Sequence, residues 1–170
     1  MSWTSFFKEA MFGEGFKYVL WMRTCRYTRQ ASWARFVLYP FAWVMLRRQR
    51  YRLGISIPFR TDVGRGLYIG HFGGIVVHEK TTIGKNCNIS QGATIGQANR
   101  GRNKGYPTIG DNVFIGPGAR IFGAIRIGNN VAVGANCVVA KDVPDNAVVV
   151  GVPARVISFE GSRDYVNRTL

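Results

Sequence analysis

Residues 81–96 have the sequence TTIGKNCNISQGATIG, in which an isoleucine returns at every sixth position, 83, 89 and 95. The same period continues on both sides, through an isoleucine or valine at positions 57, 63, 69, 77, 109, 115, 121, 127, 133 and 139. Glycine directly follows eight of these thirteen residues, where a backbone without a Cβ turns easily. The pattern predicts short strands joined by tight turns.

A six-residue repeat favours a solenoid of parallel strands, three to a coil, with a triangular cross-section. The β-branched residue would point inward, and a small or apolar residue four positions later, such as Cys87 or Cys137, would join it in the core. A β-sandwich would instead show alternation of period two and turn signals about every 8 to 12 residues. We therefore expect an all-β fold, a parallel β-helix over residues 55–157, with a short α-helical N-terminal segment (residues 1–54) and a C-terminal tail (residues 158–170).

Residues 1–54 differ in composition from the repeat. They contain all four tryptophans, 14 of the 22 aromatic residues, and ten Lys or Arg against two Glu, a net +8 of the total +14. The segments GFKYVLWMRTCRYTRQ (15–30) and SWARFVLYPFAWVMLRRQRYR (32–52) predict two helices. We expect one apolar stripe of Phe16, Val19, Leu20 and Tyr27 and another of Phe36, Val37, Phe41, Val44 and Met45.

Two interpretations of these helices remain open. Basic residues flanked by aromatic side chains suit an interfacial helix, kinked at Pro40, on an anionic membrane surface. Alternatively, the helices close the first coil of the solenoid. No apolar run approaches the roughly 20 residues of a bilayer span, no secretory leader is seen, and three scattered cysteines make no disulfide framework. We therefore expect a cytoplasmic protein, with at most a peripheral contact on the inner face of the plasma membrane.

Two interruptions of the period mark candidate functional segments. The step from Ile69 to Val77 is eight residues long and contains His71. The step from Ile95 to Ile109 is fourteen residues long and extrudes QANRGRNKGYP (97–107), which has three basic residues and no acid. A solvated surface loop is the alternative interpretation of this second segment.

Stacking the coils in threes predicts a column along one edge of the solenoid. The edge residues would be Ile69, Ile89, Ile115, Val133 and Gly151. The residues two positions further on would be His71, Gln91, Pro117, Ala135 and Pro153. Small or flat side chains leading to a histidine would leave a groove, which suits a long, thin ligand that ends at a base.

Three segments, GHFGGIVVHE (70–79), ISQGATIG (89–96) and GVPARVI (151–157), resemble the hexapeptide-repeat acetyltransferases with a left-handed β-helix, specifically the serine acetyltransferase branch. The left hand is implied by this resemblance, which covers residues 55–157, since the general preference for right-handed crossovers favours the other hand. The resemblance also implies a homotrimer with sites between neighbouring β-helices, where acetyl-CoA runs along the groove to a catalytic histidine. By motif match that histidine is His71. We expect acetyl-CoA to contact Gln91, Gly116, Pro117, Ala135, Lys141 and Arg155.

Transfer of an acetyl group from a thioester to a hydroxyl requires a base and a donor for the oxyanion. Imidazole accepts protons near neutral pH, so His71 would take the hydroxyl proton. A backbone N–H of the glycine-rich edge would stabilise the oxyanion. Ser56, Glu79 or a main-chain carbonyl could orient His71, and His78 and Tyr106 are candidate contacts of the acceptor.

The serine acetyltransferase pattern is broken at three positions. In that branch an aspartate lies fifteen residues before the histidine, another directly precedes it, and a second histidine follows thirty-five residues later, whereas this chain has Ser56, Gly70 and Tyr106. Because an amino-acid acceptor needs charged partners, these differences argue against free serine. We expect the acceptor to be a sugar hydroxyl of a lipid-linked precursor of a bacterial surface polysaccharide, as in capsule and exopolysaccharide pathways. Serine O-acetylation is the alternative.

Two other classes of protein are disfavoured. A zinc site like that of a β-helical carbonic anhydrase needs three histidines, and the chain has two, so we expect no metal. Positive charge alone suggests nucleic-acid binding. The aromatic residues, however, lie beside apolar helical stripes and form no base-stacking platform, so we expect no nucleic-acid partner.

Overall fold

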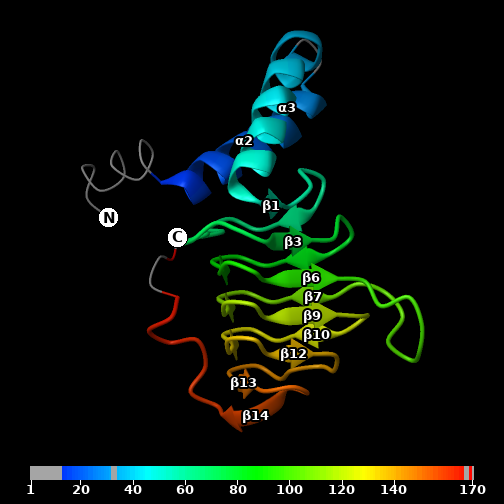
Figure 1. The fold of residues 1–170 in the computed structure, drawn as a ribbon, viewed down its shortest axis with the longest axis vertical. Helices are drawn as coiled ribbons and strands as arrows, with labels where there is room; N and C mark the ends of the chain where they lie inside the picture. The colour runs from blue at the N-terminus through cyan, green and yellow to red at the C-terminus, as the bar shows by residue number, and fades with distance from the viewer. Residues whose placement is uncertain (1–12, 32–33, 167–168, 170) are drawn as a thin grey trace.

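The computed structural model describes residues 13–31, 34–166 and 169, and it shows a three-sided β-helix with a helical hairpin at one end (Figure 1). The hairpin consists of α2 (Glu14–Gln30) and α3 (Ala34–Leu53), and the first strand follows directly. No helix among the described residues is both long and apolar enough to cross a membrane.

The strands form the three sides of the β-helix, called here sheets A, B and C. Sheet A contains β1 (Ile55–Ser56), β3 (Ile75–Val77), β6 (Thr94–Gly96), β9 (Arg120–Phe122) and β12 (Val138–Val139). Sheet B contains β2 (Asp62–Val63), β4 (Thr82–Ile83), β7 (Thr108–Ile109) and β10 (Arg126–Ile127). Sheet C contains β5 (Asn88–Ile89), β8 (Phe114–Ile115), β11 (Ala132–Val133), β13 (Val148–Val150) and β14 (Arg155–Ser158). Neighbouring described strands pair in parallel, except β13 with β14.

The core of the β-helix consists of the residues that define the six-residue period. All thirteen of these Ile and Val residues are buried. Equivalent residues stack from coil to coil, as Ile83, Ile109 and Ile127 do in sheet B. Cys87 and Cys137 are fully buried in the same core, as predicted. The structure therefore confirms the predicted parallel β-helix and its helical N-terminal segment.

The sheets meet at three corners, named A/B, B/C and C/A in the order in which the chain passes them. At the B/C corner a ladder of side-chain amides joins Asn86, Asn112, Asn130 and Asn146, with nitrogen-to-oxygen distances of 2.9 to 3.1 Å. All four residues have φ between +53° and +61°, in the left-handed region that asparagine tolerates better than most residues. The ladder thus stabilises four consecutive tight turns.

The segment after β14 runs back along sheet C towards the upper coils (Figure 1). The N–H of Ser162 donates to the carbonyl of Asn130 at 2.9 Å. The ring of Tyr165 stacks on Phe114 at 4.8 Å, and the side-chain amide of Asn88 donates to the carbonyl of Tyr165 at 2.9 Å. These contacts hold the described part of the C-terminal tail against the β-helix.

Helix α2 closes the first coil. The buried hydroxyl of Tyr18 accepts a hydrogen bond from the N–H of Ile57 and donates one to its carbonyl, each at 2.9 Å. Arg26 forms an ion pair with Asp62 at 3.1 Å. At Gly15 the helix approaches so closely that a Cβ would lie 2.1 Å from the carbonyl oxygen of Ile69. Of the two interpretations of the N-terminal helices, α2 fits the capping one.

The predicted apolar stripes of both helices were wrong. The buried face of α2 contains Tyr18, Met22 and Cys25, whereas Leu20 and Tyr27 of the predicted stripe are exposed. The buried residues of α3 are Ala42, Leu46, Gln49 and Leu53, and the predicted stripe is mostly exposed. The buried residues Ala42, Leu46, Gln49 and Leu53 recur at three- and four-residue spacing and form the inward face of α3, so most of its aromatic and valine side chains face outward.

Tyr18→Phe should lower the free energy of unfolding by about 2–4 kcal/mol, because both backbone groups of Ile57 would lose a buried hydrogen-bond partner. Chemical denaturation measures this change. Tyr27→Phe is the matched control, since Tyr27 lies on the same helix and is 73% exposed, and it should be nearly neutral. Equal stability of the two variants would contradict the role given to Tyr18.

Candidate functional site

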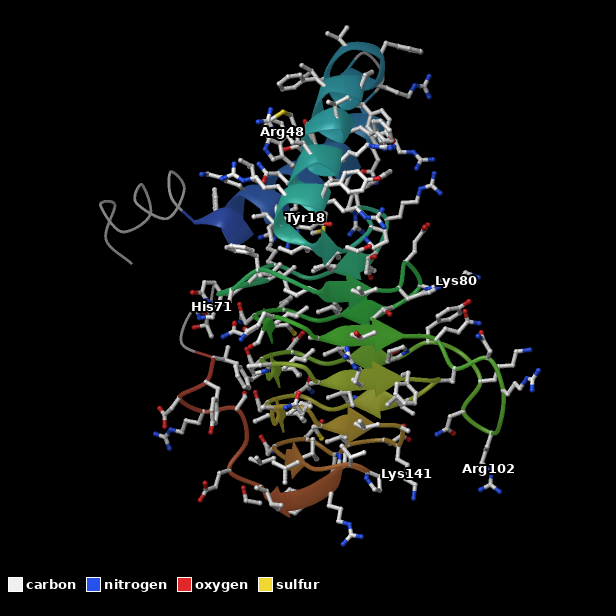
Figure 2. All side chains as sticks on the ribbon, viewed as in Figure 1. Tyr18, Arg48, His71, Lys80, Arg102 and Lys141 are labelled. Carbon is white, nitrogen blue, oxygen red and sulfur yellow. The ribbon has the colours of Figure 1, made fainter. Side chains whose placement is uncertain are left out.

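The C/A corner carries His71 in a turn that is two residues longer than the turns below it. Backbone hydrogen bonds of 2.7 and 2.9 Å place Gly73 directly above Gln91, and Gln91 above Pro117. His71 and Phe72 are therefore the two extra residues of this turn, and they protrude from the corner with both side chains exposed. Figure 2 shows His71 at one lateral edge of the β-helix.

The observed pairing of the coils shows that the predicted column was wrong in two places. His71 does not lie directly above Gln91, because the long turn inserts two residues between them. At the lower end Val133 pairs with Val149, so Val149 takes the edge position that was predicted for Gly151. The reason is that this last coil is sixteen residues long instead of eighteen. Gln91, Pro117 and Ala135 do form one column, since Asn136 donates its N–H to the carbonyl of Pro117 at 2.8 Å.

Glycine keeps the C/A corner narrow. Gly74, Gly92 and Gly118 have φ of +66°, +72° and +70°, which most residues avoid. A Cβ on Gly74 or Gly92 would lie 3.4 Å from the Cα of the next glycine below. The corner therefore presents backbone in place of side chains, which is the arrangement that a close-fitting ligand or an oxyanion donor requires.

The side chain of His71 has no hydrogen bond or ion pair with the residues that the structure describes. Ser56 lies in β1, where it is half-buried and pairs with Val76. The carboxylate of Glu79 lies 3.7 Å from the guanidinium of Arg60. Neither Ser56 nor Glu79 contacts His71, so their role in orienting the imidazole stays a prediction.

A second group of candidate site residues lies at the A/B corner. The imidazole of His78 stacks on the ring of Tyr106 with 4.5 Å between centroids, and the ammonium of Lys80 lies 5.3 Å from the same ring. The N–H of Lys80 donates to Nδ1 of His78 at 3.1 Å, which in the neutral imidazole leaves the proton on Nε2. With the adjacent pair of Arg60 and Glu79, the corner combines a carboxylate, two cations and two aromatic rings.

Sequence reasoning found His78, Glu79 and Tyr106 but missed Arg60 and Lys80. Arg60 reaches Glu79 from the previous coil, nineteen residues earlier. The twenty-residue step from Ile57 to Val77, between equivalent positions of the first two coils, would have revealed this pair. Lys80 directly follows Glu79 and was overlooked because its partner, Tyr106, lies in the long loop.

The residues predicted to bind the cofactor do not all lie at one corner. Gly116, which is buried, and the column of Gln91, Pro117 and Ala135 lie at the C/A corner, and Arg155 begins β14 just after the lowest turn of that corner. Lys141 lies at the A/B corner, on the opposite lateral edge in Figure 2. Within one chain, Lys141 and the column therefore cannot contact the same short stretch of a ligand.

The loop at residues 97–107 is held against the β-helix. Ala98 and Gly105 exchange two backbone hydrogen bonds of 3.0 Å, and the side-chain amide of Asn103 donates to the carbonyl of Ala140 at 2.9 Å. Its three basic side chains, Arg100, Arg102 and Lys104, are exposed, and Arg102 points away from the β-helix in Figure 2. Below the loop lies an open hollow of about 480 Å³, lined by Tyr106, Thr108, Gly110, Ala124, Ile125, Arg126, Ile127 and Asp142.

Sheet A separates the two groups of candidate site residues. His71 precedes β3 and His78 follows it, so the three residues of β3, about 10 Å of strand, lie between them. His71 and Lys80 accordingly lie at opposite edges of the same chain (Figure 2). The described residues contain no group of three or more His, Cys, Asp and Glu side chains that could hold a metal ion.

Comparison with known proteins identifies the repeat and the fold. The family of the bacterial transferase hexapeptide (six repeats) matches residues 106–141. A serine acetyltransferase of Staphylococcus aureus is 43% identical over 114 residues, which is 67% of this chain and 54% of that protein. The crystal structure of Neisseria gonorrhoeae serine acetyltransferase in complex with serine has a TM-score of 0.70 and 33% identity over 85% of this chain and 57% of that one. The crystal structure of Brucella abortus serine acetyltransferase in complex with coenzyme A has a TM-score of 0.73 and 32% identity over 85% of this chain and 56% of that one.

These similarities make the fold a left-handed parallel β-helix, as the resemblance implied. The chain spans about half the length of the curated relatives it matches. The matches also show that the predicted acceptor, a sugar of a surface polysaccharide, was wrong, because the relatives of known structure and sequence are serine acetyltransferases. That prediction treated Ser56, Gly70 and Tyr106 as a loss of charged contacts, but Glu79, Lys80 and Arg60 supply charges at the A/B corner.

All three cysteines are buried and unpaired. Burial raises the pKa of the Cys25 and Cys87 thiols to about 11, and it also raises the pKa of Cys137. Because only the thiolate attacks disulfide reagents, none of the three is suited to chemistry at neutral pH.

The native protein should therefore react with almost no Ellman's reagent at pH 8, whereas the unfolded protein should release three equivalents of thionitrobenzoate. Absorbance at the start of the reaction measures both. A rapid stoichiometric reaction of the native protein would contradict the burial of the thiols.

Proposed function

We propose that this chain, which belongs to the hexapeptide-repeat family of bacterial transferases, transfers the acetyl group of acetyl-CoA to the hydroxyl of serine. The observation that carries the proposal is the 43% identity over 114 residues to a serine acetyltransferase, together with the same fold in relatives bound to serine and to coenzyme A.

His71 is the proposed general base. It removes the proton from the serine hydroxyl as the oxygen attacks the thioester carbon. A backbone N–H of the glycine-rich C/A corner stabilises the oxyanion that forms. When this intermediate collapses, the carbon–sulfur bond breaks, and the proton held by His71 passes to the departing thiolate. An exposed imidazole without an internal partner is compatible with this role, because it is accessible to both substrates.

We further propose that the functional unit is a homotrimer in which the C/A corner of one chain faces the A/B corner of its neighbour. This arrangement brings His71 close to the neighbour's His78 and Tyr106, which sheet A separates from it within one chain. Serine carries both an ammonium and a carboxylate, so it needs charges of both signs. Glu79 would bind the ammonium and Lys80 the carboxylate, with Tyr106 as the wall between them.

The C/A column is the proposed path of acetyl-CoA. The side-chain oxygen of Gln91 is buried and has no hydrogen-bond partner among the described residues, so it can accept a hydrogen bond from an amide of the pantetheine arm. The small or flat side chains of Pro117 and Ala135 leave room for that arm beside the buried Gly116. Arg155, at the lower end, and Lys141 of the neighbouring chain would contact the phosphates.

A cytoplasmic location is part of this proposal, since that is where free serine and acetyl-CoA occur together. Peripheral contact with an anionic membrane, expected from the composition of residues 1–54, remains a separate prediction that depends on the exposed face of α3.

Release of free thiol from acetyl-CoA should depend on L-serine, and O-acetylserine should form in equal amount. Ellman's reagent measures the thiol and mass spectrometry the product. Threonine, glycine and simple sugars are the control acceptors. Turnover with sugars and none with serine would refute the proposed acceptor.

His71→Ala should lower kcat roughly 10²- to 10⁴-fold through loss of the base, and it should leave the fold unchanged because the side chain lies outside the core. Serine-dependent thiol release measures kcat, and circular dichroism with gel filtration checks fold and assembly. Activity within a few-fold of the unmodified chain would rule out His71 as the base.

Ala135→Trp should abolish acetyl-CoA binding, because an indole on this exposed position would fill the column below the catalytic turn. Isothermal titration calorimetry measures the affinity. Ala31→Trp, at the end of α2, adds the same side chain far from the corner and should bind acetyl-CoA normally. Equal affinity of the two variants would contradict the proposed path.

A further inference from the structure

The outward face of α3 exposes large apolar side chains that its packing does not use. Phe36 is 72% exposed, Val37 69%, Phe41 59% and Val44 55%. The inward face of the same helix packs through the buried residues Ala42, Leu46, Gln49 and Leu53. These four residues, called here the α3 apolar patch, lie on two and a half turns of one helix and so form a continuous surface.

A band of arginines follows the apolar patch along the helix. Arg47, Arg48, Arg50 and Arg52 occupy its last two turns and are exposed. Arg47 lies over the rings of Trp43 and Tyr51, at 5.4 and 5.5 Å from their centroids. No described carboxylate forms an ion pair with Arg47 or Arg48. Between residues 13 and 53 the chain has nine Lys or Arg and one Glu, a net charge of +8.

The hairpin presents this surface away from the rest of the molecule. It projects from the end of the β-helix opposite β14, and Arg48 lies on α3 above Tyr18 (Figures 1 and 2). From Phe36 to Val44 the helix rises about 12 Å. An interfacial helix buries its apolar face about 5–10 Å deep, with its cations at the level of the lipid headgroups. If the hairpin meets the membrane with its distal end, the apolar patch reaches this depth and the proximal arginines lie near the headgroups.

We propose that the outer face of α3 binds the surface of a membrane that contains anionic lipid. Charge complementarity selects this partner over a second copy of the chain, because two hairpins of charge +8 repel each other. The aliphatic valines of the patch select it over nucleic acid, which offers nothing apolar of comparable size to bury them. The inference is independent of the acetyl-transfer reaction, since α3 contributes no residue to the proposed site.

Co-sedimentation of the full chain with vesicles tests the proposal. The chain should bind vesicles that mix phosphatidylglycerol with phosphatidylcholine, fail to bind phosphatidylcholine alone, and be released at about 0.5 M salt, where the Debye length is only a few ångströms. No binding to the anionic vesicles at low salt would overturn the proposal. Equal binding to neutral vesicles would overturn it as well.

Two variants of the full chain separate the two components of the surface. The triple variant Arg47→Gln, Arg48→Gln, Arg50→Gln should lower the partition coefficient roughly 100-fold, as expected for three basic residues near an anionic surface. The triple variant Phe36→Ser, Val37→Ser, Val44→Ser should lower it at least about tenfold. We expect each variant to fold, because all six side chains are exposed. Circular dichroism and thermal melting measure this.

The loop at residues 97–107 provides the matched control. Arg100→Gln, Arg102→Gln, Lys104→Gln removes the same charge from exposed positions of a distant loop and should leave vesicle binding within about twofold of the unmodified chain. An equal loss in this control would show that only net charge matters and would refute a specific α3 surface. Sedimentation velocity without lipid is the second check. A change of assembly state in the apolar variant alone would assign the patch to a second copy and also refute the proposal.

Discussion

Each interior isoleucine or valine of the β-helix lies directly over its equivalent in the previous coil, and this stacking constrains the rest of the molecule. A change of register would move buried side chains out of the core, at about 1.5–3 kcal/mol for each one exposed. Extra residues can therefore be accommodated only at the corners. The long steps after Ile69 and Ile95 accordingly become the extended turn that carries His71 and the loop at residues 97–107. Most of the candidate site residues therefore lie at the corners, because the residues of the three sides are held in place by strand pairing.

Much of this arrangement could be predicted, because a period of six with β-branched residues has few structural solutions. The parallel β-helix, the burial of Cys87 and Cys137 and the unusual place of His71 all follow from it, whereas the left hand was implied only by the family resemblance. Contacts between coils were harder to foresee, since Arg60 meets Glu79 and His78 meets Tyr106 across long separations in sequence. The faces of α2 and α3 were predicted wrongly because apolar size was taken as the guide. The hydrogen bonds between Tyr18 and Ile57 decide which face of α2 turns inward, and no helical pattern contains that information.

The acceptor was mispredicted for a related reason. Substitutions at three motif positions show which groups are absent, but they do not show which groups a neighbouring coil supplies instead. The A/B corner contains a carboxylate and two cations beside Tyr106. Glu79 ends the motif GHFGGIVVHE, whereas the cations Arg60 and Lys80 lie outside it. The two helices of the hairpin face different surroundings, since α2 faces the β-helix and the large apolar side chains of α3 face outward. Acetyl transfer and lipid binding, as proposed, therefore depend on separate surfaces and can be tested separately.

Both ends of the β-helix are covered by structure that differs from the repeat. At the upper end α2 lies across the first coil, and at the lower end β14 pairs antiparallel with β13. An uncovered last coil would offer a row of free backbone groups to the first coil of another molecule, and parallel strands added in this way would propagate without limit. Because a helix covers one end and an antiparallel strand ends sheet C at the other, the two ends differ from the repeat and from each other, which disfavours stacking of identical coils into a fibre.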